Sequence, residues 1–388
     1  MTDAIPYGRQ DIDADDIAAV EAVLRSDWLT QGPAIERFER CVADYVGAKF
    51  ACAVNSATSA LHLAARAVGL GTGDVLWTVP NTFVASANAA LYCGAKVDFV
   101  DIDPQSCNLS VDALANKLAA AERENRLPKA LVAVHFAGLS CDMARIAELA
   151  QRYRFRVIED AAHAIGGDYH GQKIGNCAYS DIAVFSFHPV KIITSAEGGM
   201  LVTNDPALHQ AVSLLRSHGV TRDPALMDRV AEGDWYYQQV DLGFNYRLTD
   251  IHAALGLSQM RRIDEFVARR RDLADRYDRL LADLPVIRAP RDTKANSAWH
   301  LYVIQIDQQR TNKSRKEVFD AMRRARILVN VHYIPVHLQP YYRGFGFAPG
   351  DYPAAEAYYD NAITLPLYAA MSDEQQDRVA AALKDALA

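Results

Sequence analysis

The chain has 388 residues, half of them apolar, and 41 Lys and Arg against 48 Asp and Glu give it a net charge of −7. This is the composition of an ordinary globular protein that is long enough for two domains. Charges of both signs are mixed along the chain, which argues against the basic stripe that a nucleic-acid partner needs.

The cysteines, histidines and N-terminus exclude further classes of protein. Six scattered cysteines contain no CxxC pair, and eleven histidines form no HxxxH spacing, so we expect reduced, mostly buried thiols and no metal site. The acidic N-terminus lacks the pattern of a secretory signal, and no run of about 18 apolar residues suggests a membrane span. We therefore expect a cytoplasmic protein with no membrane partner.

Short apolar runs alternate with helical patterns from about residue 50 to 205. This alternation predicts βα units and a mainly parallel sheet, with the active-site groups at the carboxyl ends of its strands. The last runs are closely spaced, which indicates one antiparallel strand among them. The runs are FACAV, VLWTV, KVDFVDID, ALVAVHFAG, FRVIED, DIAVFSF and GMLVTND.

The remaining third of the chain predicts a second, smaller domain. Apolar positions at intervals of three and four across residues 249–284 predict one long helix or two abutting helices between the domains. HLYVIQID and ILVNVHYIPV predict strands on either side of a charged helix at 314–326, and SDEQ at Ser372 fits the capping box of a terminal helix. We expect a large domain over 1–255 and a small α+β domain over 256–388.

A turn of small and hydroxyl residues follows the first of the apolar runs. Asn55 to Leu61 read NSATSAL and open a helix, so Thr58 and Ser59 lie where free N–H groups, hydroxyls and the helix dipole suit a phosphate. A plain helix N-cap is the alternative interpretation of the same residues.

An acidic pair ends the strand FRVIED, and His163 follows three residues later. A carboxylate such as Asp160 is costly to bury without a partner, and a protonated pyridine nitrogen is a suitable one. The alternative is a cap or a surface acid, because strand ends commonly carry either.

Lys191 stands between Val190 and Ile192, in a position where burial would lower the pKa of its amine and favour a Schiff base. Most lysines are solvated surface charges, so the residue by itself indicates little. Its neighbours single it out: Ser186 ends the preceding strand, and Gly198 with Gly199 lets the chain reverse close to a ligand.

In combination, these motifs resemble the sugar aminotransferases of the DegT/DnrJ/StrS family. The resemblance covers essentially the whole chain and includes IPYGRQ, SDWLTQGP, PNTFVASANAAL, GFNYRLTD and VHLQPYY. It implies a pyridoxal 5'-phosphate (PLP) enzyme of fold type I, aspartate aminotransferase-like, with a mainly parallel seven-stranded sheet in the large domain. It also implies a homodimer with the active site at the subunit interface.

FSFHPVKIIT, SHGVTRDP and YYQQVDLGFNYR are similar to the members of the family that serve pseudaminic acid biosynthesis. This similarity implies transfer of an amino group from L-glutamate to C4 of UDP-2-acetamido-2,6-dideoxy-β-L-arabino-hex-4-ulose. Another UDP- or dTDP-4-keto sugar is an alternative substrate, and a PLP-binding regulator without catalysis is an alternative of another class. Related sugar deoxygenases carry a histidine in place of the Schiff-base lysine, so Lys191 argues against that reaction.

The resemblance also implies a role for each matching residue. Lys191 would bond PLP, Asp160 would pair with its pyridine nitrogen, and His163 would lie by its ring hydroxyl. Phe83 would cover the ring face. The implied phosphate ligands are Thr58, Ser59, Ser186 and, from the partner subunit, Asn245. The implied substrate contacts are Trp28, Leu29, Thr30, Tyr236, Arg247, Tyr333 and His337.

The chain departs from the family pattern at two positions. Ala196 stands before Glu197 where the family usually has glycine, and Ala57 stands in the turn where glycine is common. An alanine at position 196 would reshape its turn if the turn needs a positive φ.

Overall fold

Seven strands form the central sheet, and they are the seven apolar runs that the sequence predicts. The structure, a computed structural model, describes residues 4–388. The strand order is β2-β10-β9-β6-β5-β3-β4, and β10 alone runs antiparallel to its neighbours, as the close spacing of the last runs indicates. Their bounds are Phe50–Val54 (β2), Val75–Thr78 (β3), Lys96–Phe99 (β4), Ala130–Val134 (β5), Arg156–Asp160 (β6), Ile182–Ser186 (β9) and Gly199–Thr203 (β10).

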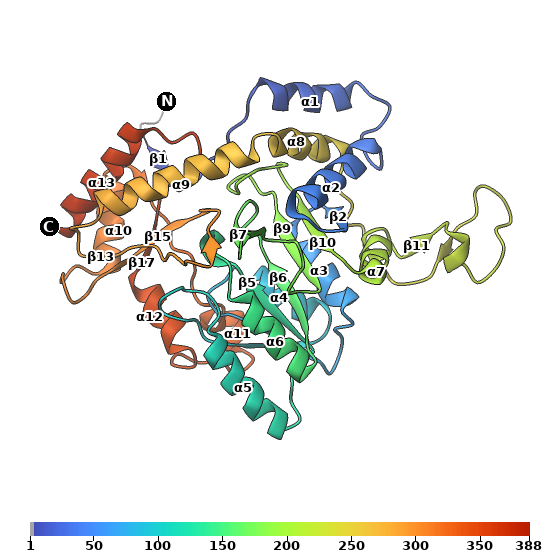
Figure 1. The fold of residues 1–388 in the computed structure, drawn as a ribbon, viewed down its shortest axis with the longest axis horizontal. Coiled ribbons are helices and arrows are strands. Elements are labelled where there is room, and N and C mark those ends of the chain that lie inside the picture. The colour runs from blue at the N-terminus through green and yellow to red at the C-terminus, as the bar shows by residue number, and fades with distance from the viewer. Residues whose placement is uncertain (1–3) are drawn as a thin grey trace.

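Helices cover both faces of this sheet, which is why its central strands are apolar along their whole length. Alternate residues of one strand belong to different apolar clusters: in β9, Val184 packs with one cluster and Phe185 with the other. The helices that follow the strands are Ala57–Ala67 (α3), Ala85–Tyr92 (α4), Val111–Arg123 (α5), Met143–Tyr153 (α6) and Pro206–Arg216 (α7) (Figure 1).

The predicted connection between the domains consists of two abutting helices. They are Asp250–Met260 (α8) and Ile263–Leu280 (α9), and α8 packs against the N-terminal helices Ala14–Leu24 (α1) and Pro33–Val46 (α2). In Figure 1, α9 runs from this helical layer toward the C-terminal elements. The predicted division at residue 255 falls inside α8 and stays a prediction, and residues 1–3 of the predicted large domain lie outside the described residues.

The C-terminal part contains a three-stranded sheet of β13 (Val286–Ile287), β15 (Tyr302–Ile306) and β17 (Ala362–Leu365). The predicted charged helix is α10 (Arg315–Arg324), and α13 (Asp373–Leu387) begins after Ser372 with the predicted capping box. The strand predicted over ILVNVHYIPV is wrong for most of its length. Only β16 (Ile327–Leu328) forms, because it pairs with the two residues of β1 (Ile5–Pro6). Two further helices lie between β16 and β17, Pro340–Arg343 (α11) and Pro353–Asn361 (α12).

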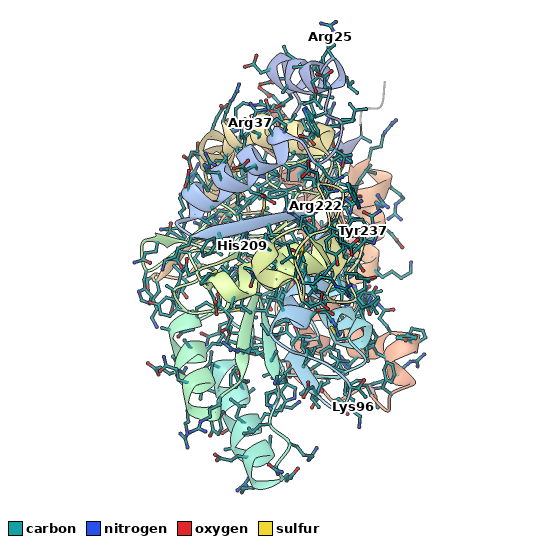
Figure 2. The ribbon with its side chains drawn as sticks, turned by 90° about the vertical axis from the view of Figure 1, so that its right-hand side faces the viewer. Arg25, Arg37, Lys96, His209, Arg222 and Tyr237 are labelled. Atoms are coloured by element: carbon teal, nitrogen blue, oxygen red, sulfur yellow. The ribbon has the colours of Figure 1, made fainter. Side chains whose placement is uncertain are left out.

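An arm projects from the structure between α7 and α8. It contains the hairpin of β11 (Val220–Thr221) and β12 (Gln238–Gln239), and it points at the viewer in Figure 2, where Arg222 and Tyr237 are labelled. Val230 and Trp235 in this arm are 90% and 73% exposed. The remaining short strands form a separate sheet of Asp168–Tyr169 (β7), Gln172–Lys173 (β8) and Ala295–Asn296 (β14).

The six cysteines are free thiols, five of them buried and Cys41 half-buried, as the composition predicts. Within residues 4–388, none of the helices is long and apolar enough to span a lipid bilayer.

Candidate active site

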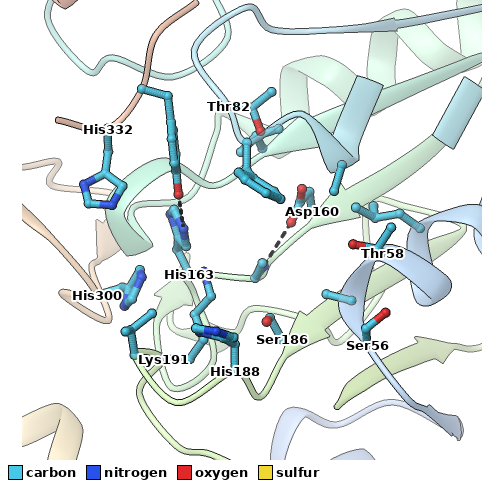
Figure 3. Close-up of a pocket in the computed structure, with 18 of the residues that line it drawn as sticks. Ser56, Thr58, Thr82, Asp160, His163, Ser186, His188, Lys191, His300 and His332 are labelled. Carbon is cyan, nitrogen blue, oxygen red and sulfur yellow. Dashed lines mark hydrogen bonds between the residues drawn. The ribbon is translucent and has the colours of Figure 1, made fainter. Parts of the chain in front are cut away.

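A cavity of about 580 Å³ lies at the carboxyl ends of the central strands. Figure 3 shows Ser56, Thr58 and Ser186 on one side of it and His163, His300 and His332 on the other. The central sheet and residues 300–333 of the C-terminal part both supply walls, and strand ends of a parallel sheet are the position expected of a ligand site in an α/β protein. The predicted site residues that line it are Thr58, Phe83, Asp160, His163, Ser186, Lys191 and Tyr333.

Lys191 lies in the loop after β9, and the apolar side chains that follow it anchor this loop. Ile192 and Ile193 are buried, and the Lys191 backbone N–H donates to the His188 carbonyl at 2.9 Å. Burial lowers the pKa of the Lys191 amine to about 8, against the attraction of the Asp160 carboxylate, which raises it. About a tenth of the amine is therefore unprotonated at pH 7 and able to attack a carbonyl carbon, far more than for a solvated lysine.

Asp160 is the last residue of β6, and its carboxylate is buried and fixed by two donors. The Ser86 hydroxyl donates to Oδ2 at 2.6 Å, and the Ala162 backbone N–H donates to Oδ1 at 3.1 Å. The carboxylate has no cationic partner among the ion pairs of the described residues. A protonated ring nitrogen in the cavity would provide the charge that this buried group lacks.

His163 connects the Asp160 end of the cavity to Tyr333 in the C-terminal part of the chain. Its Nδ1 accepts the Ala137 backbone N–H at 3.3 Å, so the ring proton resides on Nε2, 3.1 Å from the Tyr333 hydroxyl. Burial and the charge of Lys191 lower the pKa of His163, which keeps the ring neutral. The Tyr333 hydroxyl oxygen accepts a hydrogen bond from the imidazole Nε2–H, so the hydroxyl can donate its own hydrogen to an acceptor in the cavity.

The opposite end of the cavity is the N-terminus of α3. Ser56 caps this helix by accepting the Ser59 backbone N–H at 3.1 Å, while the Ser59 hydroxyl donates to Asn55 at 2.6 Å. Thr58 and Ser186 present their side chains to the cavity, whereas Ser59 does not line it. The unpaired N–H groups of the first turn and these hydroxyls form a set of donors suited to a phosphate.

Gly199 allows β10 to pack directly against the start of α3. A Cβ at this position would lie 2.5 Å from the backbone carbonyl atoms of Ser56. The glycine thus serves close packing of the helix start, and the cavity itself is reached by Glu197 from the same loop.

The other predicted site residues lie outside the cavity of one chain. Trp28 and Leu29 are exposed between α1 and α2, and Thr30 forms a bridge with Thr249. Asn245 is exposed near the base of the arm. Arg247 donates to the Ser217 hydroxyl at 3.0 Å, and the Tyr236 hydroxyl accepts from Gln238 at 3.0 Å.

His337 disagrees with its predicted place at the substrate. It is fully buried, and its Nε2 lies 2.9 Å from the Glu356 carboxylate. The turn Val336–Leu338 directs the ring to Phe99 and Tyr352 instead of the cavity. A direct contact of His337 with a substrate is therefore not compatible with this arrangement.

Several polar residues that line the cavity or bond to its lining residues have no predicted role in the sequence. Ser86 belongs to the quoted segment PNTFVASANAAL, but its bond to Asp160 depends on how α4 packs beside β6. His300 begins the predicted strand HLYVIQID, and no spacing relates it to His163, although their ring centroids are 4.4 Å apart. The others are Tyr7, Ser56, Thr82, His188, Glu197, Asn330 and His332.

The sequence and the fold match known aminotransferases over their whole length. The family described as DegT/DnrJ/EryC1/StrS aminotransferase matches residues 10–384. The chain belongs to this family. It is 39% identical to the spore coat polysaccharide biosynthesis protein SpsC of Bacillus subtilis, over 98% of this chain and 96% of SpsC.

Two solved structures show how closely the aminotransferase fold is kept. PseC of Helicobacter pylori, an aminotransferase involved in pseudaminic acid biosynthesis, aligns with a TM-score of 0.90 at 32% identity, over 99% of both chains. The PLP form of Spr1654 from Streptococcus pneumoniae aligns with a TM-score of 0.89 at 30% identity, over 99% of this chain and 98% of Spr1654.

These matches confirm the predicted fold type I, the transaminase reaction and the cofactor PLP. The cavity of this aminotransferase contains the groups that PLP requires: a buried amine, a buried carboxylate without a cation, and a helix N-terminus with two hydroxyls. The Lys191 amine suits the aldehyde, the Asp160 carboxylate suits the ring nitrogen, and the α3 N-terminus suits the phosphate.

Proposed function

We propose that this aminotransferase moves an amino group from L-glutamate to C4 of UDP-2-acetamido-2,6-dideoxy-β-L-arabino-hex-4-ulose, the reaction of pseudaminic acid biosynthesis. One observation carries the proposal: Lys191, Asp160 and the N-terminus of α3 line the same cavity. The choice of sugar is supported by the similarity to PseC across the whole chain.

In this proposal Lys191 bonds PLP, Asp160 pairs with its ring nitrogen and His163 lies by its ring hydroxyl. Phe83 covers the ring face, and Thr58, Ser59 and Ser186 hold the phosphate. The Ser59 hydroxyl donates to Asn55 and its backbone N–H donates to Ser56, so a phosphate held by Ser59 would replace one of these two acceptors.

Proton transfer is the task of the Lys191 amine. PLP supplies an electron sink for the carbon that loses its proton. The amine, whose pKa is lowered to about 8 by burial, moves that proton between the donor's α-carbon and C4′ of PLP. Asp160 keeps the ring nitrogen protonated, and its bond from Ser86 fixes the direction of the carboxylate.

A second copy of the chain completes the site in this proposal. Lys191 is the single Lys or Arg among the lining residues of the cavity within residues 4–388, yet the substrates carry carboxylates and phosphates. Asn245 and Arg247 lie at the base of the arm. The arm exposes the apolar side chains of Trp235 and Val230, which contact with another chain would bury. We propose a homodimer in which the partner subunit brings this region to the cavity. Trp28, Leu29, Thr30, Tyr236 and Tyr333 stay proposed substrate contacts, and a cytoplasmic location stays a prediction.

A substrate panel tests the choice of sugar. The purified enzyme is given glutamate with UDP- and dTDP-linked 4-keto sugars, and each product is identified by mass spectrometry and NMR. We expect the highest kcat/KM for the UDP-linked L-arabino sugar. A preference of tenfold or more for another sugar would overturn the assignment, and the similarity to SpsC makes a different polysaccharide precursor the second candidate.

A further inference from the structure

Arg270 is a buried cation that the proposed reaction does not use. It lies on α9 and is 2% exposed, and none of the ion pairs among residues 4–388 includes it. Its Nη1 group donates to the carbonyls of Trp299, His300 and Leu367 at 3.2, 3.3 and 3.1 Å. Burying a guanidinium without a carboxylate costs free energy. The three hydrogen bonds to backbone carbonyls offset part of this cost, which indicates that Arg270 holds this backbone in place.

The backbone that Arg270 holds has an unusual conformation. Trp299 has a φ of +52°, which is rare for a bulky side chain. The turn packs against Gly138, where an added Cβ would lie 2.9 Å from both the Trp299 nitrogen and the His163 carbonyl oxygen. The Ala298 N–H donates to the Gly138 carbonyl at 3.0 Å. The turn is thus held from α9 on one side and from residues 137–138 on the other.

This turn places the His300 ring in the wall of the active-site cavity. The ring is 4% exposed and tilts against His163 with a centroid separation of 4.4 Å. His300 Nδ1 is buried without a hydrogen-bond partner among the described residues. Since Ala137 and Tyr333 fix both nitrogens of His163, His300 covers the ring face that these two bonds leave open.

We infer that Arg270 is a positioning residue of the aminotransferase, which acts by holding the Trp299–His300 turn and, through it, the His300 ring against His163. The contacts run from α9 to the turn, from the turn to His163, and from His163 to Tyr333 in the cavity. Burial, followed by electrostatic repulsion from His163, Lys191 and Arg270, lowers the pKa of His300, so the imidazole pair stays neutral beside the amine. A loosened turn would admit water to this pair and alter the protonation of the lysine that bonds PLP.

The test is the pH titration of the absorbance of bound PLP in the complete enzyme, with no donor or sugar present. Arg270→Met keeps volume and removes all three hydrogen bonds, whereas Arg270→Lys keeps the charge but not the planar fork. We expect both variants to shift the titration midpoint by about 0.5 pH or more, with the larger shift in Arg270→Met. The matched control is Arg276→Met on the same helix, which loses ion pairs with Asp373 and Asp377, neither of which lines the cavity, and it should titrate like the wild type.

A double variant tests whether Arg270 acts through His300. We expect Arg270→Met with His300→Phe to titrate like His300→Phe alone, because the ring that Arg270 positions is already lost. Additive shifts in the double variant, or a wild-type midpoint in folded Arg270→Met, would overturn the inference. If Arg270→Met does not fold by circular dichroism, a wild-type midpoint in Arg270→Lys would overturn it equally. The inference rests on PLP binding and not on the identity of the sugar, so failure of the substrate panel leaves it untouched.

Discussion

At the scale of single residues, the site depends on how burial changes Lys191. In water the pKa of this amine would be 10.5, whereas burial in the cavity lowers its pKa to about 8. The Asp160 carboxylate opposes this change, so the two residues together set the pH at which the amine becomes a nucleophile.

We therefore predict a pH dependence for the capture of PLP by the apoenzyme. The free amine is the attacking species, so the rate should rise with pH through a midpoint near 8 and level off above it. Stopped-flow absorbance across a pH series measures this rate. Asp160→Asn removes an attraction that raises the lysine pKa, so its midpoint should be lower. A midpoint near 10.5 in the wild type would show that the amine is solvated.

Ser86 offers a milder test of the Asp160 carboxylate. Ser86→Ala removes the 2.6 Å hydrogen bond to Oδ2 but leaves the charge, so we expect the half-reaction with an amino donor to slow by about tenfold. Asp160→Ala removes the charge, and we expect a loss of about 100-fold or more. Single-turnover bleaching of the PLP absorbance measures both. Equal rates in Ser86→Ala and the wild type would contradict an orienting role.

The sequence identifies those site residues whose neighbours in the chain carry the signal. Lys191, Asp160 and His163 stand at strand ends within 32 positions of one another, and they meet in one cavity as expected. Ser86 and His300 carry no comparable signal, because their contacts with Asp160 and His163 join distant segments. His337 lies in a family-like segment, yet burial against Glu356 directs it away from the cavity.

At the scale of elements, long apolar runs are predictable and short paired strands are not. Central strands such as β5 and β9 read as nearly continuous apolar runs because both faces of the sheet are buried there. β16 has two residues and exists because β1 pairs with it from more than 320 positions away, which no local pattern reveals.

The turn after Lys191 has a positive φ at Ala196, the position where the family usually has glycine. Ala196 has a φ of +66°, a region that costs an alanine about 1 kcal/mol. We predict that Ala196→Gly raises the melting temperature of the apoenzyme by about 1 °C or more. Ala147→Gly, in the interior of α6, is the control and should lower it. A lower melting temperature in Ala196→Gly would show that the positive φ carries no cost here.

At the scale of the whole molecule, the cavity of one chain holds too few cations for its substrates. Among the lining residues within 4–388, Lys191 is the single Lys or Arg, while Asp160 and Glu197 are acidic. The arm between α7 and α8 carries exposed apolar side chains, and Asn245 lies at its base. These features lead to the proposed homodimer with shared sites.

Mixed dimers test this sharing. Lys191→Ala and Asn245→Ala should each be inactive or weak alone, because one lacks the amine and the other lacks a proposed phosphate ligand of the partner's site. In a mixed dimer both defects fall in one site and leave the other intact. Random mixing should then restore about a quarter of the wild-type activity. If native mass spectrometry shows mixed dimers that remain inactive, Asn245 does not act across the interface.

The most direct test of the central claim is to find the lysine that bonds PLP. The yellow enzyme is reduced with borohydride, which makes the link permanent, and is then digested with trypsin and analysed by mass spectrometry. The account predicts the added mass on the peptide containing Lys191, with cleavage after this residue blocked. The same mass on any other lysine, with Lys191 unmodified, would contradict it.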